Sequence, residues 1–186
     1  GVVKGIVTWN MTGQHSVANA LATIAAAEHV GVSIETACAA LSNFGGVKRR
    51  MELLGTVRGI EVYDDFAHHP TAIETTLDGA RKRLAERKLW AIIEPRSNTM
   101  RMGSHKDGLA HSARLADEVI WYQPEGLDWD LQPVIEAASN KAVVARSLED
   151  IIQTVVSQAG EGDAVVIMSN GGFGGLHQKL IAALQA

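Results

Sequence analysis

The chain has 186 residues, of which 46% are hydrophobic and 20% charged, and its formal net charge is −4. This composition is typical of a compact globular chain, excludes disorder as the main state, and offers no basic surplus for nucleic acid or an anionic membrane. The single cysteine excludes a disulfide framework and fits a reducing, cytoplasmic compartment, and no apolar run approaches the roughly 20 residues that span a bilayer. The first residues lack the pattern of a signal peptide and Gly1 is not an initiator, so we expect a piece of a longer protein.

The first 46 residues predict one strand followed by two helices. Residues 2–9 form a β-rich run, whereas the apolar residues of 16–30 and 34–44 recur at spacings of three and four, as in amphipathic helices. Ser16 and Ser33 stand where each helix would begin, and serine is a favoured N-cap residue. The small side chains of both helices predict that they pack closely.

After Gly46 the pattern changes to a regular alternation of strands and helices. Residues 90–93 and 165–168 are continuously apolar, which is typical of strands covered on both faces of a mostly parallel sheet. We therefore predict a doubly wound α/β domain over 47–186, preceded by a helical remnant of another domain over 1–46. The expected strands are 50–57, 60–63, 89–93, 118–122, 142–145 and 164–168, and the expected helices are 71–86, 106–115, 131–138, 148–159 and 175–184.

Four polar segments follow strands of this predicted sheet. They cover residues 64–70, 94–101, 123–125 and 169–175. In an open α/β sheet, ligands bind outside the carboxyl ends of the strands. If the strands are parallel, all four segments lie on one edge, and this convergence is a stronger signal than any single segment.

The first polar segment contains Asp64, Asp65, His68 and His69. Carboxylates and imidazoles at this density could hold a divalent metal, orient a phosphate-bearing ligand or transfer a proton. The alternative is a plain loop in which Asp65 caps the next helix and the histidines face water. Adjacent histidines are expected to point apart, which argues against a single metal held by both.

The second polar segment places Arg96 and Arg101 around Ser97, Asn98 and Thr99. A guanidinium group binds carboxylates or phosphates through two parallel hydrogen bonds, so this loop suits an anionic substrate. The alternative is a solvated loop whose arginines pair with nearby acids. We favour the functional interpretation, because the loop stands at a strand end.

The glycine-rich segment 170–175 precedes the last helix, so its amides and the positive helix end could bind an anion. A tight strand-to-helix turn explains it equally well, since it is not a Walker A loop. Taken alone, Arg49 and Arg50 are expected to be solvated residues at the start of a strand. Asn19 is expected to be an ordinary polar position of a helix, and His177 is expected to be one of several surface histidines.

Five ordered segments resemble the Mur ligases, a family of ATP-dependent enzymes of peptidoglycan metabolism. Three carry the family resemblance: residues 13–22 (GQHSVANALA), 44–52 (FGGVKRRME) and 64–73 (DDFAHHPTAI). Residues 94–101 (EPRSNTMR) and 169–180 (SNGGFGGLHQKL) are similar to the members that act on a cell-wall tripeptide.

The resemblance implies a cytoplasmic enzyme that uses ATP and Mg²⁺ to join L-Ala-γ-D-Glu-meso-diaminopimelate, the murein tripeptide, to UDP-N-acetylmuramate through an acyl phosphate, in peptidoglycan recycling. It implies that residues 1–46 end a central ATP-binding domain and that 47–186 form a Rossmann-like C-terminal domain. The P-loop and the Mg²⁺ ligands would lie in the missing N-terminal and central domains, so this piece alone is expected to be inactive. The alternatives are a UDP-N-acetylmuramate–L-alanine ligase, a metal-dependent hydrolase using Asp64 and His68, and a non-catalytic binding module.

The resemblance also implies roles for individual residues, none of them a catalytic group or a metal ligand. Asn19 matches a residue that contacts adenine, Arg50 one that reaches the ATP phosphates, and Asp64 one that binds the ribose. Ser16 departs from the family, which often has asparagine there. The residues implied to bind the amino substrate are His68, His69, Arg96, Ser97, Asn98, Arg101, Ser169, Asn170 and Gly171.

Overall fold

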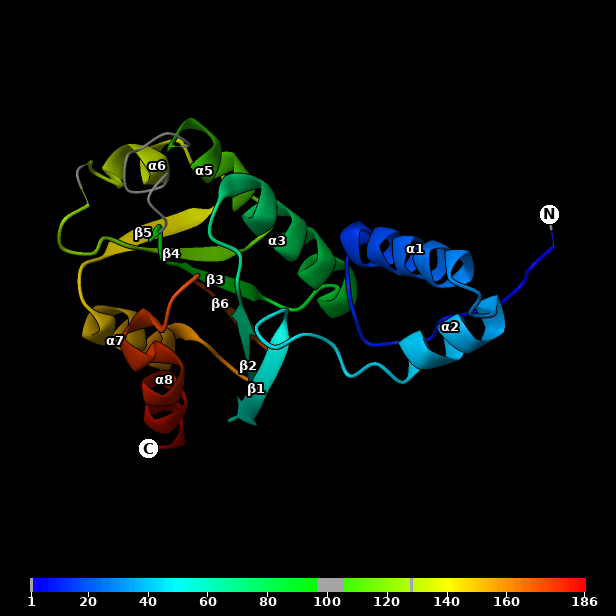
Figure 1. Cartoon of the computed structure of the whole chain (residues 1–186). Helices are drawn as coiled ribbons and strands as arrows, with labels where there is room; N and C mark the ends of the chain where they lie inside the picture. The colour runs from blue at the N-terminus through cyan, green and yellow to red at the C-terminus, as the bar shows by residue number, and fades with distance from the viewer. Residues whose placement is uncertain (1, 97–105, 128) are drawn as a thin grey trace. The chain divides into compact units, whose positions relative to one another are not determined.

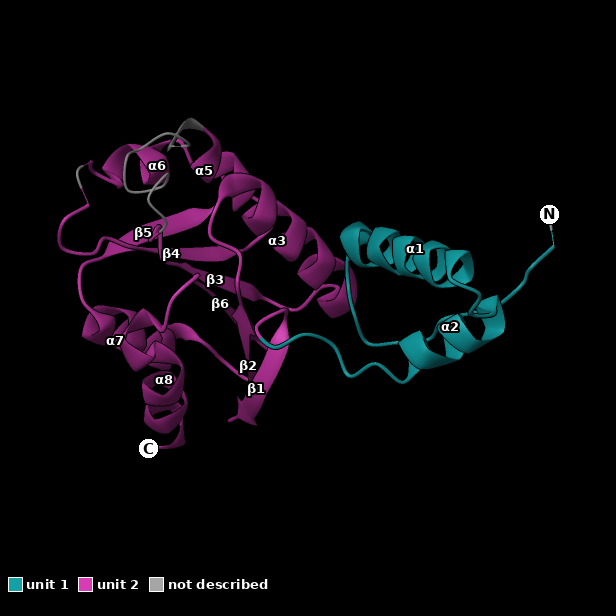
Figure 2. Cartoon of the chain, in the orientation of Figure 1, with its two compact units in different colours: residues 1–48 teal, residues 49–186 magenta. Residues whose placement is uncertain are grey.

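The computed structural model describes residues 2–96, 106–127 and 129–186 of the chain (Figure 1). The chain forms two compact units, residues 1–48 and 49–186 (Figure 2). Because each unit has its own internal packing, each is described by itself.

Unit 1 contains two packed helices, α1 (Gln14–His29) and α2 (Ile34–Ser42). Ser33 is the predicted N-cap of α2, and its side chain accepts a hydrogen bond from the Thr36 amide at 3.2 Å. The prediction that Ser16 caps the first helix is wrong. Gly13 occupies the N-cap with a φ of 86°, while the buried Ser16 hydroxyl donates to the Thr12 carbonyl at 2.7 Å.

The predicted strand over residues 2–9 does not form. A strand is defined by hydrogen bonds to a neighbouring strand, and the described part of unit 1 contains helices alone. Instead, this segment runs against α2. The Thr8 amide donates to the Ser42 hydroxyl at 3.1 Å, and Gly5 lies so close to Cys38 that a Cβ at Gly5 would fall 2.7 Å from its sulfur.

The described residues of unit 2 form a six-stranded sheet in the order β1-β2-β6-β3-β4-β5. The β1–β2 pair is antiparallel, and every other neighbouring pair is parallel. This confirms the predicted α/β class with a mostly parallel sheet. The strands are β1 (Glu52–Val57), β2 (Ile60–Asp65), β3 (Leu89–Ile93), β4 (Glu118–Tyr122), β5 (Lys141–Ala145) and β6 (Ala164–Met168).

Helices cover both faces of the sheet, as the apolar strands predict (Figure 1). Alternate residues of β3 enter two separate cores: Ala91 and Ile93 pack with α3, α5 and α6, whereas Trp90 and Ile92 pack with α7 and α8. All residues of β3 are therefore buried. The helices are α3 (Pro70–Leu84), α5 (Lys106–Ser112), α6 (Gln132–Glu136), α7 (Leu148–Gln158) and α8 (Leu176–Gln185), the last preceded by the 3₁₀ turn η1 (Phe173–Gly175).

Two boundaries of the sheet differ from prediction in ways that shape its carboxyl edge. β1 begins at Glu52 rather than at residue 50, because Arg49 and Met51 have positive φ angles of 59° and 48°. β2 continues through Asp65, because parallel pairing with β6 extends to the Asp65–Met168 position. None of the helices in the described ranges has the length and apolar character to cross a membrane.

Candidate functional site

The carboxyl ends of the parallel strands bring the predicted polar segments to one edge of the sheet. At the ends of β2, β6 and β3, the Ser169 amide donates to the Asp65 carbonyl at 3.1 Å, and the Glu94 amide donates to the Met168 carbonyl at 3.0 Å. At the ends of β4 and β5, the Gln123 amide donates to the Ala145 carbonyl at 2.8 Å. Segments far apart in the sequence are thus held side by side along this edge.

Asp64 lies at the carboxyl end of β2 and contacts two basic side chains. Its Oδ2 accepts a hydrogen bond from the Arg49 Nε at 3.1 Å, and its Oδ1 lies 3.1 Å from the Nε2 of His177. Burial raises the pKa of the Asp64 carboxyl, but hydrogen bonding to His177 and the charges of His177 and Arg49 outweigh burial and lower the pKa below its ordinary value. Asp64 is therefore an ionised carboxylate with its side chain 12% exposed.

His177 and Arg49 are the two residues of this cluster that sequence reasoning missed. His177 was expected at the surface but is only 7% exposed, because it lies on the buried face of α8. Arg49 was expected to be a solvated strand start, yet its Nη2 donates to the carbonyls of Ser169 and Gly171 at 2.6 and 2.8 Å. The available signal for His177 was its position beside Leu176 and one turn before Leu180, two residues of the apolar stripe of α8.

Asp65 anchors the loop that leads from β2 into α3. Its Oδ2 accepts from the Met51 amide at 2.9 Å, and its Oδ1 accepts from the Ala67 amide at 2.8 Å and the Thr76 hydroxyl at 3.0 Å. The N-cap of α3 is His69, so the interpretation of Asp65 as the helix cap is wrong. With three protein donors, the buried Asp65 carboxylate fixes the loop rather than offering a free ligand oxygen.

His68 and His69 follow in the same loop. The Nδ1 of His68 lies 2.9 Å from the Phe66 carbonyl oxygen, which holds its ring in place. The two rings were expected to point apart, but they make an edge-to-face contact with centroids 5.4 Å apart. Within ranges 2–96, 106–127 and 129–186, no group of three His, Cys, Asp or Glu side chains could hold a metal ion. The metal-hydrolase alternative therefore lacks a donor set there.

Ser169 connects the end of β6 to the end of β3. Its hydroxyl donates to the Glu94 Oε2 at 2.5 Å and accepts from the Gly171 amide at 3.0 Å. The Arg96 guanidinium packs against Gly171. A Cβ atom added at Gly171 would lie 2.3 Å from the Nη1 of Arg96. Arg96 is exposed, so the contact presents a guanidinium at the surface of the edge.

Asn170 lies between these residues and is half-buried, with its Oδ1 inaccessible. That oxygen has no hydrogen-bond partner in the part of the chain that the structure describes. Asn170 therefore presents a buried side-chain acceptor between Ser169 and Gly171.

Of the remaining predicted site residues, one flanks this cluster, one belongs to unit 1 and three lie outside the described residues. Arg50 is exposed, and its guanidinium lies over the Phe66 ring at 5.5 Å from the centroid. Asn19 is exposed on α1 in unit 1. The predicted site residues that lie outside the described residues are Ser97, Asn98 and Arg101.

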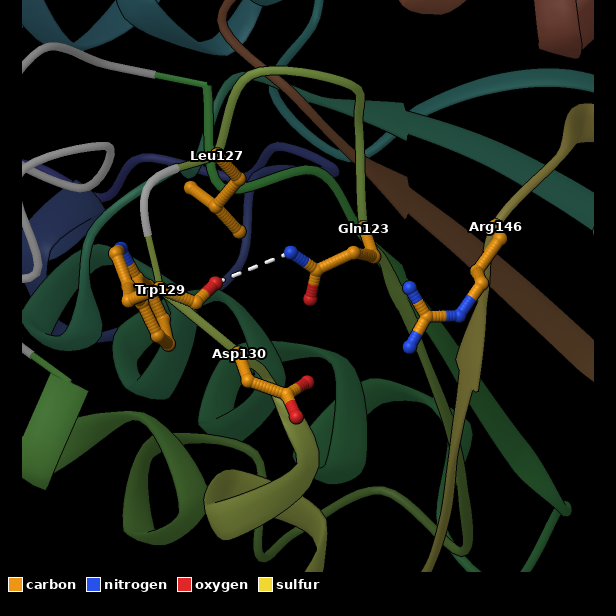
Figure 3. Close-up of a pocket in the computed structure, with 5 residues that line it drawn as sticks. All are labelled: Gln123, Leu127, Trp129, Asp130 and Arg146. Atoms are coloured by element: carbon orange, nitrogen blue, oxygen red, sulfur yellow. Dashed lines mark hydrogen bonds between the residues drawn. The ribbon is translucent and has the colours of Figure 1, made fainter.

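Farther along the same edge, an open pocket of about 310 Å³ lies beyond the ends of β4 and β5 (Figure 3). It is lined by Gln123, Leu127, Trp129, Asp130 and Arg146. Of these residues, only Gln123 belongs to a segment singled out in the sequence.

Comparisons with known proteins agree with this fold. Residues 49–171 match the Mur ligase, glutamate ligase domain family. A Haemophilus influenzae protein named UDP-N-acetylmuramate–L-alanyl-gamma-D-glutamyl-meso-2,6-diaminoheptandioate ligase is 46% identical over 180 residues, covering 96% of this chain and 40% of that protein. The UDP-N-acetylmuramate–L-alanine ligase of Desulfitobacterium hafniense is 32% identical over 191 residues, covering 97% of this chain and 42% of that protein.

A crystal structure of a murein peptide ligase from Psychrobacter arcticus is similar along almost the whole chain. It is 60% identical, has a TM-score of 0.77, and the match covers 96% of this chain and 38% of that one. The mostly parallel sheet with a polar carboxyl edge defines unit 2 as a Rossmann-like α/β domain. The chain belongs to the Mur ligase family, which confirms the resemblance seen in the sequence. It spans about 40% of the length of the curated relatives that it matches.

Proposed function

We propose that this chain is the amino-substrate-delivering part of an ATP-dependent ligase that joins L-Ala-γ-D-Glu-meso-2,6-diaminoheptanedioate to UDP-N-acetylmuramate. The observation that carries the proposal is the exposed Arg96 guanidinium, which lies against Gly171 at the middle of the polar carboxyl edge. The name of the relative that is 46% identical states this substrate pair. The alternative substrate, L-alanine, is named by a relative that is 32% identical.

Three residues are proposed to contact the nucleotide. We propose that Arg50 contacts the phosphates, Asp64 a ribose hydroxyl, and Asn19 the adenine. The exposed guanidinium of Arg50 and the ionised carboxylate of Asp64 fit these roles. ATP would supply the phosphoryl group that activates the muramyl carboxylate as an acyl phosphate. Following the resemblance to the family, we propose that the Mg²⁺ ligands lie in the N-terminal and central domains of the full protein.

The amino substrate would bind over β6 and β3. The tripeptide is rich in carboxylates, and a guanidinium binds a carboxylate through two parallel hydrogen bonds, which suits Arg96. The unpartnered, buried Oδ1 of Asn170 suits an N–H of the peptide. His68 and His69 would form one wall of the site, and Ser169 would position its floor through Glu94 and Gly171. The set of proposed substrate-binding residues is completed by Ser97, Asn98, Arg101 and Gly171.

The proposed reaction needs the rest of the enzyme. We propose that residues 1–46 end a central ATP-binding domain, that 47–186 form the C-terminal domain, and that closure of the two excludes water from the acyl phosphate. The isolated chain is then inactive in ligation. ATP and a UDP-linked sugar are made inside the cell, so we propose a cytoplasmic enzyme of peptidoglycan recycling.

The test uses the full-length protein and follows ADP release with ATP, Mg²⁺ and UDP-N-acetylmuramate. We expect turnover with the tripeptide, and a loss of at least tenfold in kcat/KM for Arg96→Gln because a charge-assisted contact is removed. Arg83→Gln is the matched control, because Arg83 is an exposed arginine near the far end of α3. Turnover with L-alanine alone would establish the alternative, and no turnover with either would refute both.

A further inference from the structure

The pocket at the ends of β4 and β5 continues the edge that carries the proposed amino-substrate site. The sheet order places β6, β3, β4 and β5 side by side, so the edge runs from Ser169 past Arg96 and Gln123 to Arg146. At about 4.8 Å between neighbouring strands, the distance from β6 to β5 is roughly 14 Å. An extended tripeptide spans about 10 Å along its backbone, and a γ-linked glutamate and a long third side chain add to that reach.

The pocket combines both signs of charge with apolar surface. Arg146 and Asp130 are exposed and approach the pocket from different segments, the end of β5 and the loop before α6 (Figure 3). Across the described ranges, Arg146 has no hydrogen bond or ion pair, and the Asp130 carboxylate accepts only from the Gln132 amide, at 3.1 Å. Leu127 and Trp129 supply the apolar part of the lining.

The wall of this pocket is already held in place by Gln123. Its Nε2 donates to the Trp129 carbonyl at 3.1 Å, and its Oε1 accepts from the Leu131 amide at 3.0 Å. Leu131 is fully buried, and the backbone of Gln123 is bonded to Ala145 at the end of β5. Binding in a preformed pocket avoids much of the entropic cost of ordering a loop around the ligand.

We propose that this pocket binds the distal end of the third residue of the tripeptide, an α-amino acid group with one ammonium and one carboxylate. Arg146 binds the carboxylate, Asp130 binds the ammonium, and the Trp129 ring packs against the methylene stem. This proposal rests on the proposed function, because it takes the tripeptide as the substrate. The reacting amine lies at the other end of the peptide, so the pocket determines specificity and not the chemical step.

The experiment compares three peptides with the full-length ligase, by calorimetric affinity and by KM and kcat. The first is the tripeptide. The second has L-lysine as its third residue, which keeps the distal ammonium and lacks the distal carboxylate. The third is the dipeptide L-Ala-γ-D-Glu, which reaches neither group. Arg83→Gln again serves as the matched control.

We expect Arg146→Gln to weaken tripeptide binding and raise its KM by about tenfold, with kcat nearly unchanged, because one charge-assisted hydrogen bond is lost. The same variant leaves the affinity for the lysine peptide and the dipeptide unchanged. Asp130→Asn weakens binding of the tripeptide and of the lysine peptide but not of the dipeptide. Arg83→Gln changes none of these affinities.

Unchanged tripeptide affinity in both pocket variants would overturn the proposal, and so would an equal loss for all three peptides. The test of the pocket and the test of the ligase activity can fail independently of each other. Tripeptide binding that depends on Arg146 without any ADP release would refute the ligase and leave the subsite standing. Tripeptide turnover that neither variant alters would refute the subsite and leave the ligase standing, whereas a wild-type protein that binds no peptide would refute both.

Discussion

The Asp64 carboxylate on β2 and the His177 imidazole on α8 face each other 3.1 Å apart, with 12% and 9% of their side chains exposed. Neither the Asp64 Oδ1 nor the His177 Nε2 has another partner in the described part of the chain. A proton on Nε2 therefore satisfies both atoms at once. The pair joins the last helix to the strand that carries the proposed ribose-binding carboxylate.

Replacement of His177 by leucine should lower the free energy of unfolding of unit 2 by about 2 kcal/mol at pH 7, because Asp64 Oδ1 is left buried without a donor. The pKa of Asp64 is lowered in the folded state, so its contribution to stability is present above the ordinary pKa of about 4. That contribution is lost as pH falls through the folded pKa. The difference between His177→Leu and wild type should therefore shrink below about pH 4, in urea titrations followed by tryptophan fluorescence.

His177→Gln is the matched variant, since its amide keeps a donor within the reach of a flexible side chain. We expect it to retain part of the stability that leucine loses. An equal loss for both variants, independent of pH, would mean that His177 acts through packing rather than through Asp64.

A second prediction concerns Gly171, which is not among the glycines with positive φ and whose Cβ position lies against the Arg96 side chain. Gly171→Ala would put a Cβ 2.3 Å from the Arg96 Nη1, and the flexible end of Arg96 can move away. We expect the stability to change by less than about 1 kcal/mol, while KM for the tripeptide in the full-length ligase rises severalfold. The measurement pairs thermal unfolding with steady-state kinetics.

Gly172→Ala is the control for this substitution. Gly172 has a φ of −78°, and a Cβ there meets nothing within 4 Å, so neither stability nor KM should change. A rise in KM for both glycine variants would indicate a general change in the loop, and unchanged KM for Gly171→Ala would separate Arg96 from substrate binding.

The parts of this fold that sequence reasoning predicted depend on local patterns. The apolar runs of β3 and β6 have their predicted bounds, because burial on both faces requires continuous apolar sequence. The start of β1 was missed because the positive φ of Met51 comes with a hydrogen bond from its amide to Asp65, a residue of another strand. Such long-range contacts leave no periodic signal in the chain.

The same reasoning explains which site residues were found. Strand ends predicted the polar edge, and the structure brings residues 65, 94 and 169 together there. The roles of Arg49 and His177 were missed because each depends on contacts across the sheet: Arg49 with carbonyls that follow β6, and His177 with the end of β2. The strand predicted over residues 2–9 failed for the opposite reason, since its local pattern is strong but the described part of unit 1 supplies no partner strand.

Asp65 should contribute far more to the free energy of unfolding than an exposed aspartate does. Asp65→Ala removes the acceptor for the Met51 and Ala67 amides and the Thr76 hydroxyl, so we expect a loss of about 2–4 kcal/mol. Asp78→Ala breaks an exposed ion pair with Lys82 and should cost less than about 0.5 kcal/mol. Urea denaturation of both variants gives the comparison, and equal losses would contradict a structural role for the Asp65 carboxylate.

Tyr63 should make the stability fall at alkaline pH. Burial and a hydrogen bond from its hydroxyl to Glu61, with an O–O distance of 2.5 Å, raise the pKa of Tyr63 to about 12. The ordinary value is about 10, so the contribution to stability is complete below pH 10 and is lost as pH rises toward 12. Absorbance titration at 295 nm (roughly the phenolate band) should show Tyr63 ionising well above pH 10 in the folded chain. Tyr63→Phe assigns the signal against Tyr122, whose pKa burial also raises, and a Tyr63 signal centred near pH 10 would contradict the buried hydrogen bond.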